Sequence, residues 1–367
     1  MRIIKVNDDR TLKKFLKLPS NLYRENPYWV PPLISDLKKN LSPQNPFFKH
    51  AEAVFFLAEG ANEKTGRIAA IVDRNYIEFH REDVGFFGLF ECSNNAIVAR
   101  GLLDSARSWL REKGLKGMIG PINLSTNDEC GILIDGFDLP PCLMMPYNPS
   151  YYTSLLEGYG LRKAKDLLAY TVDIPEEIPE KIKRVAERLI KSDIRVRPIN
   201  MKEFDREVML FKELYNSAWE LNWGFVPITD EEIEWTAKRM KPLIIPNLAL
   251  FAEVEGRPVG LMLILPDYNQ VLKHLNGHIG ITGIFKFLFY SRKIDTLRLM
   301  ILGVKKEYRN YGIDALLYLK SLEGMKNKRY KRVELSWVLE DNIAVHRIAH
   351  HFGAKVYKRY RIYEMDI

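Results

Sequence analysis

The sequence has few cysteines and no apolar run long enough to cross a membrane. Cys92, Cys130 and Cys142 are the only cysteines among 367 residues, and they form no C-x-x-C pair. This pattern excludes a disulfide framework and a zinc ribbon, and it favours a reducing compartment. The longest apolar stretch, 279–290, is interrupted by two glycines and a lysine, whereas a membrane span needs about 20 apolar residues. The charged start does not resemble a signal peptide, so we expect a cytoplasmic location.

The chain is basic, and its excess charge is concentrated near one end. Lys and Arg number 55 against 47 Asp and Glu, a net charge of +8. Residues 301–367 contain 14 basic and 8 acidic residues and so contribute +6. Such a region suits an anionic partner. We expect a small polyanion and no nucleic acid, because the sequence contains no helix-turn-helix, zinc finger or aromatic stacking platform.

An internal repeat divides the chain. Five identities recur at an offset of 193 residues: Gly160/Gly353, Lys165/Lys358, Tyr170/Tyr363, Asp173/Asp366 and Ile174/Ile367. Each copy predicts a helix, a glycine C-cap and a strand. We therefore predict two related domains, 1–174 and 196–367, with a linker helix over 175–195.

Strands and helices follow the same order in both predicted domains. In the first domain we expect strands at 54–58, 68–73, 86–91 and 117–119 and a helix at 96–113. In the second we expect helices at 201–220, 229–241, 312–326 and 342–351 and strands at 248–254, 259–265, 297–304 and 332–338. This order predicts an α+β fold in which each domain has a twisted mixed sheet flanked by helices.

The strongest motif follows the predicted strand 297–304. The segment Arg309 to Asp314 reads R-N-Y-G-I-D, and a helix begins directly after Gly312. Backbone N–H groups at a helix N-terminus form a site for a pyrophosphate. Gly312 lets the backbone approach the phosphates, because it has no Cβ. Farther along, Asn342-Ile-Ala344 opens another helix.

These motifs resemble those of the GNAT superfamily of acyl-CoA N-acyltransferases. In that family the phosphate loop reads Gln/Arg-x-x-Gly-x-Gly/Ala, and a later helix begins Asn-x-x-Ala. Asp314 departs from the pattern, because Gly or Ala is usual there. The resemblance covers about 196–367, and the repeat extends the fold to 1–174. The corresponding stretch of the first domain, 91–103, lacks the motif, so we expect a degenerate domain that shapes the acceptor side.

The tandem arrangement looks like that of the Fem-type peptidoglycan transferases and the protein N-myristoyl transferases. The chain also resembles a group of uncharacterised bacterial tandem GNAT proteins through the stretches 85–91, 120–123 and 144–149. That group is similar to bacterial enzymes proposed to N-acylate long-chain amines. The resemblance implies a thioester donor and an amine acceptor.

The resemblance also implies where coenzyme A or acyl-CoA would bind. The pantetheine arm would pair with the strand at 302–304, and the loop N–H groups would hold the pyrophosphate. The expected cofactor-binding residues are Leu302, Gly303, Val304, Arg309, Asn310, Tyr311, Gly312, Ile313, Asp314, Ala315 and Asn342. No metal is expected, because Arg347 replaces the glutamate of an H-E-x-x-H motif.

The acid–base residues are less clearly indicated. Many family members carry a tyrosine acid where this chain has Ala349. His346 and His350 lie on one face of the predicted helix and are candidates for an acid or base. Glu334, which faces the cleft by strand alternation, is the third catalytic candidate. The alternative for the histidines is an ordinary, partly exposed helix face.

Two apolar segments could contact the acceptor. Four aromatic residues within eleven positions form an expected substrate wall, or else part of the core: Tyr215, Trp219, Trp223 and Phe225. The insertion 274–293 is apolar, aromatic and basic at its end. It predicts a lid that makes a peripheral membrane contact or holds a long acyl chain; the alternative is a helix packed on the neighbouring domain.

Together these observations predict an acyl-CoA-dependent N-acyltransferase in which a small-molecule or lipid amine attacks the thioester directly. One alternative is a non-catalytic GNAT-like binding protein, which Asp314 and Ala349 favour. Another is an acyltransferase that uses acyl carrier protein or aminoacyl-tRNA as donor, which the basic last 67 residues allow. We expect it in the cytoplasm, peripheral to the membrane.

Overall fold

The computed structural model describes residues 1–60, 65–178, 180, 183–185, 189, 193–325 and 329–367. We refer to residues 1–174 as the first half and to residues 194–367 as the second half. The predicted linker helix over 175–195 falls partly on residues outside this description. Within the described residues, no helix is long and apolar enough to span a membrane.

The strands and helices that were expected at stated positions outside the linker are present with bounds that differ by a few residues, and further elements that were not expected accompany them. The first half contains β1 (Arg2–Lys5), α1 (Asp9–Leu22), α2 (Ile34–Asn40), β2 (Ala51–Glu59), β3 (Gly66–Asp73), α3 (Arg74–His80), β4 (Val84–Cys92), α4 (Ala96–Glu112), β5 (Gly117–Gly120), β6 (Ile132–Asp135), α5 (Tyr151–Tyr159) and β7 (Arg162–Asp173). The second half contains β8 (Ile194–Pro198), α7 (Phe204–Trp219), α8 (Asp230–Met240), β9 (Ala249–Val254), β10 (Arg257–Pro266), α9 (Asn269–Leu272), α10 (Ile281–Ser291), β11 (Thr296–Val304), α11 (Ile313–Met325), β12 (Arg332–Leu339), α12 (Ile343–His351) and β13 (Lys355–Asp366).

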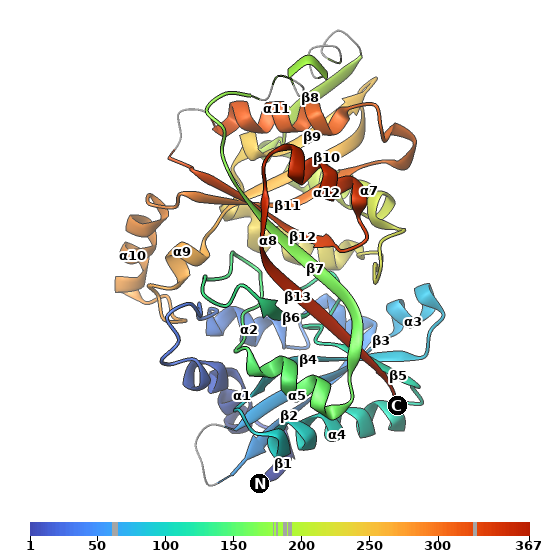
Figure 1. Cartoon of the computed structure of the whole chain (residues 1–367), viewed down its shortest axis with the longest axis vertical. Coiled ribbons are helices and arrows are strands. Elements are labelled where there is room, and N and C mark those ends of the chain that lie inside the picture. Colours follow the sequence, from blue (N-terminus) through green and yellow to red (C-terminus); the bar gives the residue numbers. More distant parts are fainter. Residues whose placement is uncertain (61–64, 179, 181–182, 186–188, 190–192, 326–328) are drawn as a thin grey trace.

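All strands join one mixed sheet that runs through the molecule (Figure 1). The order is β1-β2-β3-β4-β5-β13-β7-β12-β11-β10-β9-β8, and β6 pairs with β13 away from this path. Adjacent pairs are antiparallel except for β4 with β5 and β11 with β12. The α+β architecture predicted from the sequence, with a mixed sheet flanked by helices, is therefore confirmed.

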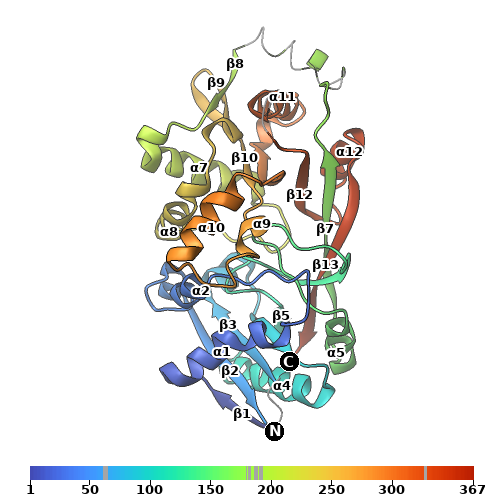
Figure 2. The ribbon, with the colours of Figure 1, turned by 90° about the vertical axis from the view of Figure 1, so that its left-hand side faces the viewer.

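The two halves exchange their last strands at the centre of the sheet. β7 pairs with β12 and β13, both from the second half, and β13 pairs with β5, β6 and β7 from the first. Figure 2 shows these two long strands running between the lower and upper parts of the molecule. The repeated tyrosines follow the exchange: Tyr170 bonds to His346 of α12 (2.7 Å), and Tyr363 bonds to Glu157 of α5 (3.0 Å).

Strand alternation explains how each half packs helices on both faces of the sheet. Every residue of β3 is buried, so successive side chains enter opposite cores. Ile68 and Ala70 pack with α4 in one cluster, whereas Ala69 and Ile71 pack with Phe15 of α1 in another. In the second half, α11 covers one face of β9–β11 while α7 and α8 cover the other.

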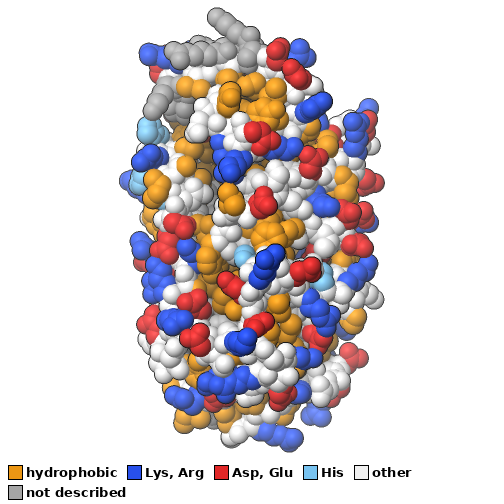
Figure 3. Space-filling model, turned by 90° about the vertical axis from the view of Figure 1, so that its right-hand side faces the viewer, with side chains coloured by type: hydrophobic (Ala, Val, Ile, Leu, Met, Phe, Trp, Pro, Cys, Tyr) orange, Lys and Arg blue, Asp and Glu red, His pale blue; other side chains and the backbone are white. Residues whose placement is uncertain are grey.

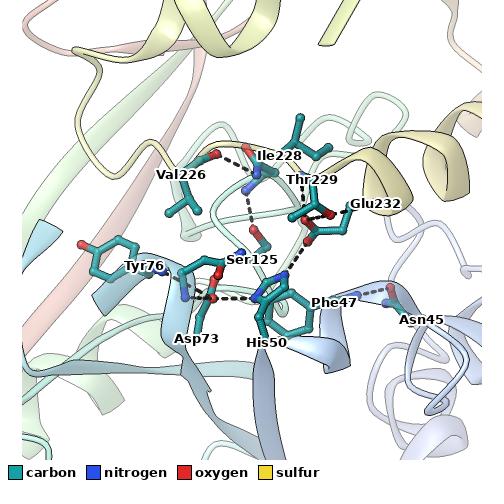
Figure 4. A network of polar contacts seen from close by, with 12 residues as sticks. Asn45, Phe47, His50, Asp73, Tyr76, Ser125, Val226, Ile228, Thr229 and Glu232 are labelled. Atoms are coloured by element: carbon teal, nitrogen blue, oxygen red, sulfur yellow. Dashed lines mark hydrogen bonds and ion pairs between the residues drawn. The ribbon is translucent and has the colours of Figure 1, made fainter. Parts of the chain in front are cut away.

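A charged histidine joins the first half to α8 (Figure 4). His50 Nδ1 lies 2.9 Å from Asp73 Oδ1, and His50 Nε2 lies 3.2 Å from Glu232 Oε1. Asp73 also caps α3, and Glu232 forms a capping box with Thr229. Burial by itself lowers the pKa of His50, but the two carboxylates outweigh it and raise that pKa to about 9.

This histidine should make stability depend on alkaline pH. Its folded pKa of about 9 exceeds the ordinary 6.5, so its contribution is complete below pH 6.5 and is lost as pH rises through 9. We expect His50→Gln to lower the free energy of unfolding by about 1–2 kcal/mol at pH 6, allowing for solvent screening, and by much less at pH 10. Urea denaturation measures both values. The exposed His278→Gln is the control; an equal loss from His50→Gln at both pH values would contradict the prediction.

Candidate functional site

The parallel strands β11 and β12 diverge halfway along their length. They pair from Thr296 with Arg332 to Leu299 with Leu335, and no farther. Beyond this point β11 continues beside β10 as far as Val304, while β12 continues beside β7. The edge of β11 at 300–304 therefore has no strand partner on the side of β12, and the expected pantetheine-binding residues 302–304 lie on it. Unpaired backbone groups there are available to an amide-containing ligand.

The expected pyrophosphate loop leads from β11 into α11. Asn310 and Gly312 adopt left-handed backbone conformations, with φ of +67° and +86°, and the helix starts at Ile313. The first N–H groups of such a helix have no acceptor within it and carry partial positive charge. Asp314 lies in this first turn. Tyr311 is exposed, and Ala315 follows within the same turn.

Linker residues lie against this loop. A Cβ added to Gly312 would be 2.6 Å from Val185 Cγ1 and 3.3 Å from Leu189 Cδ1. A phosphate over Gly312 and the Val185 side chain would therefore occupy the same space. In the described structure the loop is covered from this side.

The basic residues before α11 are largely engaged with α7. Arg309 donates to the carbonyl of Ala218 (2.8 Å) and to that of Val304 (3.2 Å). Lys305 pairs with Glu213 at 2.7 Å, whereas Lys306 is exposed. Arg309 thus fastens the loop to the end of α7 and does not point along the N-terminus of α11.

Asn342 has a local structural role. Its side chain accepts a hydrogen bond from the N–H of Val345 at 3.3 Å, which caps α12. Asparagine is favoured at this position because its side-chain oxygen satisfies a free N–H group. The segment Asn342-Ile-Ala344 therefore marks the start of α12, with one residue fewer between Asn and Ala than in the Asn-x-x-Ala pattern.

Three of the four expected acceptor aromatics meet beside β11. Tyr215 stacks on Trp219 with ring centroids 5.0 Å apart and lies 5.9 Å from Phe225. The Trp219 ring lies so close to Gly303 that a Cβ there would be 2.2 Å from it, so the glycine is required for this contact. Trp223 is separate: it packs against a core cluster of the first half, below Lys165.

An apolar cavity of about 130 Å³ lies between α7, α8 and strands β9–β11. Aliphatic, aromatic and methionine side chains form most of its wall, among them Val208, Phe211, Ile233, Met240, Leu263, Met300 and Ile301. Tyr215 and Asn127 add polar atoms, and the Tyr215 hydroxyl donates to Asn127 Oδ1 at 2.8 Å. This shape and lining suit a hydrocarbon chain with a polar group at one end.

A second cavity, about 540 Å³, opens between Phe79 of α3 and the outer side of α7.

The polar wall comes from the loop between β5 and β6, which sequence reasoning missed. Asn127 also donates to the carbonyl of Val226 (3.1 Å), which holds the loop against the second half. Asp128 is exposed to solvent. Desolvation of its carboxyl, with the charge of Glu129, raises the pKa of Asp128 to about 7. The neighbouring acids Asp128 and Glu129 were the sequence signal that could have indicated this loop, because carboxyls with perturbed pKa values cluster at functional sites.

Glu334 lies in a buried polar cluster and does not face the open cleft. It is 1% exposed and accepts a hydrogen bond from the Tyr357 hydroxyl at 2.6 Å. Burial lowers the pKa of nearby Lys358 to about 8, against the opposing effect of Glu334. Burial, with the charge of Glu334, raises the pKa of Asp267 to about 7. Such groups are placed to hold the two halves together.

Arg298 is the main cation of this buried cluster. It is 5% exposed, donates to Ser336 Oγ at 3.0 Å and also bonds to the carbonyl of Leu143 in the first half. Asp267 accepts from the N–H of the same Leu143 at 2.8 Å. The loop that carries Leu143 is therefore bound by opposite charges on β11 and directly after β10.

The two candidate histidines lie on α12, away from the apolar cavity. His346 uses both ring nitrogens: Nδ1 accepts from the Tyr170 hydroxyl (2.7 Å), and Nε2 donates to the Glu340 carbonyl (3.2 Å). His350 is exposed and meets the Tyr170 ring edge-on, with centroids 6.0 Å apart. The described residues contain no group of three or more His, Cys, Asp or Glu that could hold a metal ion.

The exchanged strands, the diverging β11 and β12 and the loop before α11 define a tandem GNAT fold. A solved tandem GNAT protein from the clavulanic acid biosynthesis pathway superposes with a TM-score of 0.59 at 13% sequence identity, covering 100% of this chain and 98% of that one. The fold and the family resemblance expected from the sequence are thereby confirmed.

No family model matches the chain. It is 35% identical over 372 residues to the bacterial ceramide synthase of Caulobacter vibrioides, covering 99% of this chain and 97% of that protein. It is 32% identical over 363 residues to Protein YghO of Escherichia coli, covering 97% of this chain and 93% of that protein. The chain belongs to the family of tandem GNAT proteins that includes these two relatives.

Loss of the Arg298 cation should be strongly destabilising. Arg298→Ala removes the buried hydrogen bonds to Ser336 Oγ and to the Leu143 carbonyl and leaves these groups unsatisfied, so we expect the free energy of unfolding to fall by about 2–4 kcal/mol. Guanidinium denaturation gives the value. Arg206→Ala, whose side chain is 74% exposed, is the control and should cost less than about 0.5 kcal/mol. A loss below 1 kcal/mol for Arg298→Ala would contradict this role of the cluster.

Proposed function

We propose that the protein is an acyl-CoA-dependent N-acyltransferase whose acceptor is a long-chain lipid amine of the sphingoid type. The observation that carries the proposal is the apolar cavity beside the point where β11 and β12 diverge, with a polar loop of the first half in its wall. Kinship with a protein named ceramide synthase supports the same chemistry, because a ceramide is an N-acylated sphingoid base. We further propose that the two halves correspond to the domains 1–174 and 196–367, of which only the second binds the donor.

The residues present fit an acyl-CoA donor, which when bound supplies an acyl group activated as a thioester. The free edge of β11 at 302–304 offers hydrogen bonds to the pantetheine amides. The N-terminus of α11 offers N–H groups to the pyrophosphate, and Lys306 offers an additional positive charge. Donor binding over Gly312 requires Val185 and Leu189 to vacate the space that they occupy there.

Asp128 is proposed as the general base. An alkyl ammonium must lose a proton before its nitrogen can attack, and a carboxylate with a pKa of about 7 accepts one at neutral pH. The nitrogen then forms the amide bond as the carbon–sulfur bond breaks. After the attack the nitrogen loses a second proton, which the leaving thiolate takes up to become the thiol of coenzyme A. The first proton passes from Asp128 to solvent, so the step releases one proton and requires no further reactant. The Tyr215–Asn127 pair orients the amine beside Asp128.

The histidines are assigned a different role. His346 holds Tyr170, and with it β7, against α12, and we propose that it positions the diverging strands. Tyr215, Trp219 and Phe225 form the proposed wall around the acceptor, whereas Trp223 packs against the first half. We also propose that acylation takes place at a membrane surface, with residues 274–293 making the peripheral contact.

A second function is favoured by a specific observation. Val185 lies over Gly312, Arg309 is held by backbone carbonyls, and Asp314 adds a negative charge at the helix start. A GNAT-like protein that binds a lipid amine without transferring an acyl group would show these features. Incubating the protein with a sphingoid amine and either palmitoyl-CoA or palmitoyl-acyl carrier protein distinguishes the cases by mass spectrometry. If no N-acyl product forms with either donor, the enzymatic proposal is overturned.

Donor binding should depend on Gly312. Gly312→Glu puts a carboxylate where the pyrophosphate is expected, so the thermal shift produced by coenzyme A should disappear. Gly256→Glu is the matched control, because Gly256 has a similar φ of +76° but no atom within 4 Å of an added Cβ. This control has the same backbone strain and should keep the shift. A coenzyme A shift that persists in Gly312→Glu would place the donor elsewhere.

Asp128 should determine the pH dependence of the rate. We expect Asp128→Asn to lower kcat about 100-fold at pH 7 with little change in KM. The wild-type rate should fall below pH 7 as the carboxyl becomes protonated, and the variant should lack this step. Steady-state assays from pH 5.5 to 9 test both points. Asp83→Asn, at an exposed aspartate paired with Lys116, is the control; a wild-type profile in Asp128→Asn would exclude the base.

A further inference from the structure

Helix α10 turns an apolar stripe toward solvent. Its exposed side chains follow the spacing of a core-facing helix: Ile281 (81%), Ile284 (52%), Phe285 (70%), Leu288 (51%) and Phe289 (54%). Residues three and four apart on a helix share one face, and such a face is normally buried. A contiguous exposed apolar surface of this kind marks an interaction site.

The inner face of α10 is firmly packed, so this orientation is fixed. Phe287 stacks on Tyr268 with ring centroids 5.7 Å apart, and Tyr290 stacks on His274 at 3.6 Å. The insertion is also tied to the first half, where the N–H of Ile34 donates to the Gly277 carbonyl at 3.0 Å. The stripe therefore belongs to a docked helix, which projects at the left of Figure 1 and faces the viewer in Figure 2.

The segment that carries the stripe is basic and contains no acid of its own. Residues 268–294 include no Asp or Glu, but they include Lys273, Lys286, Arg292 and Lys293. The opposite side of the molecule differs, because Figure 3 shows Lys, Arg, Asp and Glu interspersed there. Apolar side chains with basic neighbours match an anionic bilayer, where the former enter the interface and the latter meet lipid phosphates. A second copy of the chain would instead bring like charges together.

An apolar path connects α10 with the cavity. Tyr268 and Leu272 pack in the same cluster as Met240, Leu263 and Met300, and the last three line the cavity. Phe287 of α10 lies directly on Tyr268. A chain leaving a bilayer at α10 would therefore meet apolar side chains on its way to the cavity.

We propose that α10 docks the protein on an anionic lipid bilayer by inserting the stripe from Ile281 to Phe289, and that the acceptor passes from the bilayer along Tyr268 and Leu272. The docking stands on the helix alone. The passage of the acceptor rests on the proposed function.

Vesicle flotation of the full chain tests the docking. The wild type should float with phosphatidylcholine vesicles containing 30% phosphatidylglycerol, and more weakly with phosphatidylcholine alone or at high salt. The double variant Ile281→Ser/Phe285→Ser should bind the vesicles at least about ten-fold more weakly than the wild type. The control is Ile97→Ser/Leu221→Ser, at positions 73% and 74% exposed and outside α10. Unchanged thermal unfolding of both double variants shows that each remains folded.

The docking would be overturned if the wild type did not float or if the α10 variant floated equally well. It would also be overturned if light scattering showed that the wild type is a dimer without lipid and that the α10 variant is a monomer. Acylation then tests the passage separately. The α10 variant should keep its rate on an amine dispersed in detergent and lose about ten-fold on the same amine in vesicles. Flotation without acylation of either substrate would refute the proposed function and leave the docking intact.

Discussion

The pairing of β7 with β13 is the interaction on which the rest of the structure depends. Each strand has both of its neighbours in the other half, so neither half has a complete sheet of its own. This pairing sets the distance and angle between the halves, and thereby brings the loop at 123–130 against α7 and α8. The cavity is lined by residues of both halves, and its polar end pairs Tyr215 of the second half with Asn127 of the first.

Polar contacts secure this arrangement away from the central strands. His50 joins Asp73 to Glu232 near α8, and Arg298 joins β11 to the loop at Leu143. Buried ionic contacts add little net stability compared with apolar packing, yet they are costly to break singly. These contacts form in only one alignment of the halves, because a shift would separate His50 from Glu232 and Arg298 from the Leu143 carbonyl. The halves are thus aligned by charge and held by strand pairing.

The sequence predicted the fold well because its evidence was local or repeated. The offset between Gly160 and Gly353 indicated two related units, and the strand expected at 297–304 was found at Thr296–Val304. The exchange itself was beyond prediction, since alternation defines the faces of a strand but not its neighbours.

Asp128 was missed for a similar reason: its surroundings come from Tyr215 and other residues about 90 positions away. Trp223 was grouped with Trp219 by nearness in sequence, but α7 ends at Trp219 and the chain turns to the first half.

The exchange also affects how the chain is made on the ribosome. β5 gains its second neighbour only when the end of β13 emerges, about 245 residues later. At usual translation speeds of about 5–20 residues per second, the nascent first half waits roughly ten to fifty seconds with an open sheet edge. Such an edge is a template for wrong pairing with other chains. The first half of the growing polypeptide therefore has an open edge throughout synthesis of the second half, and its sheet is completed by the last strand of the sequence.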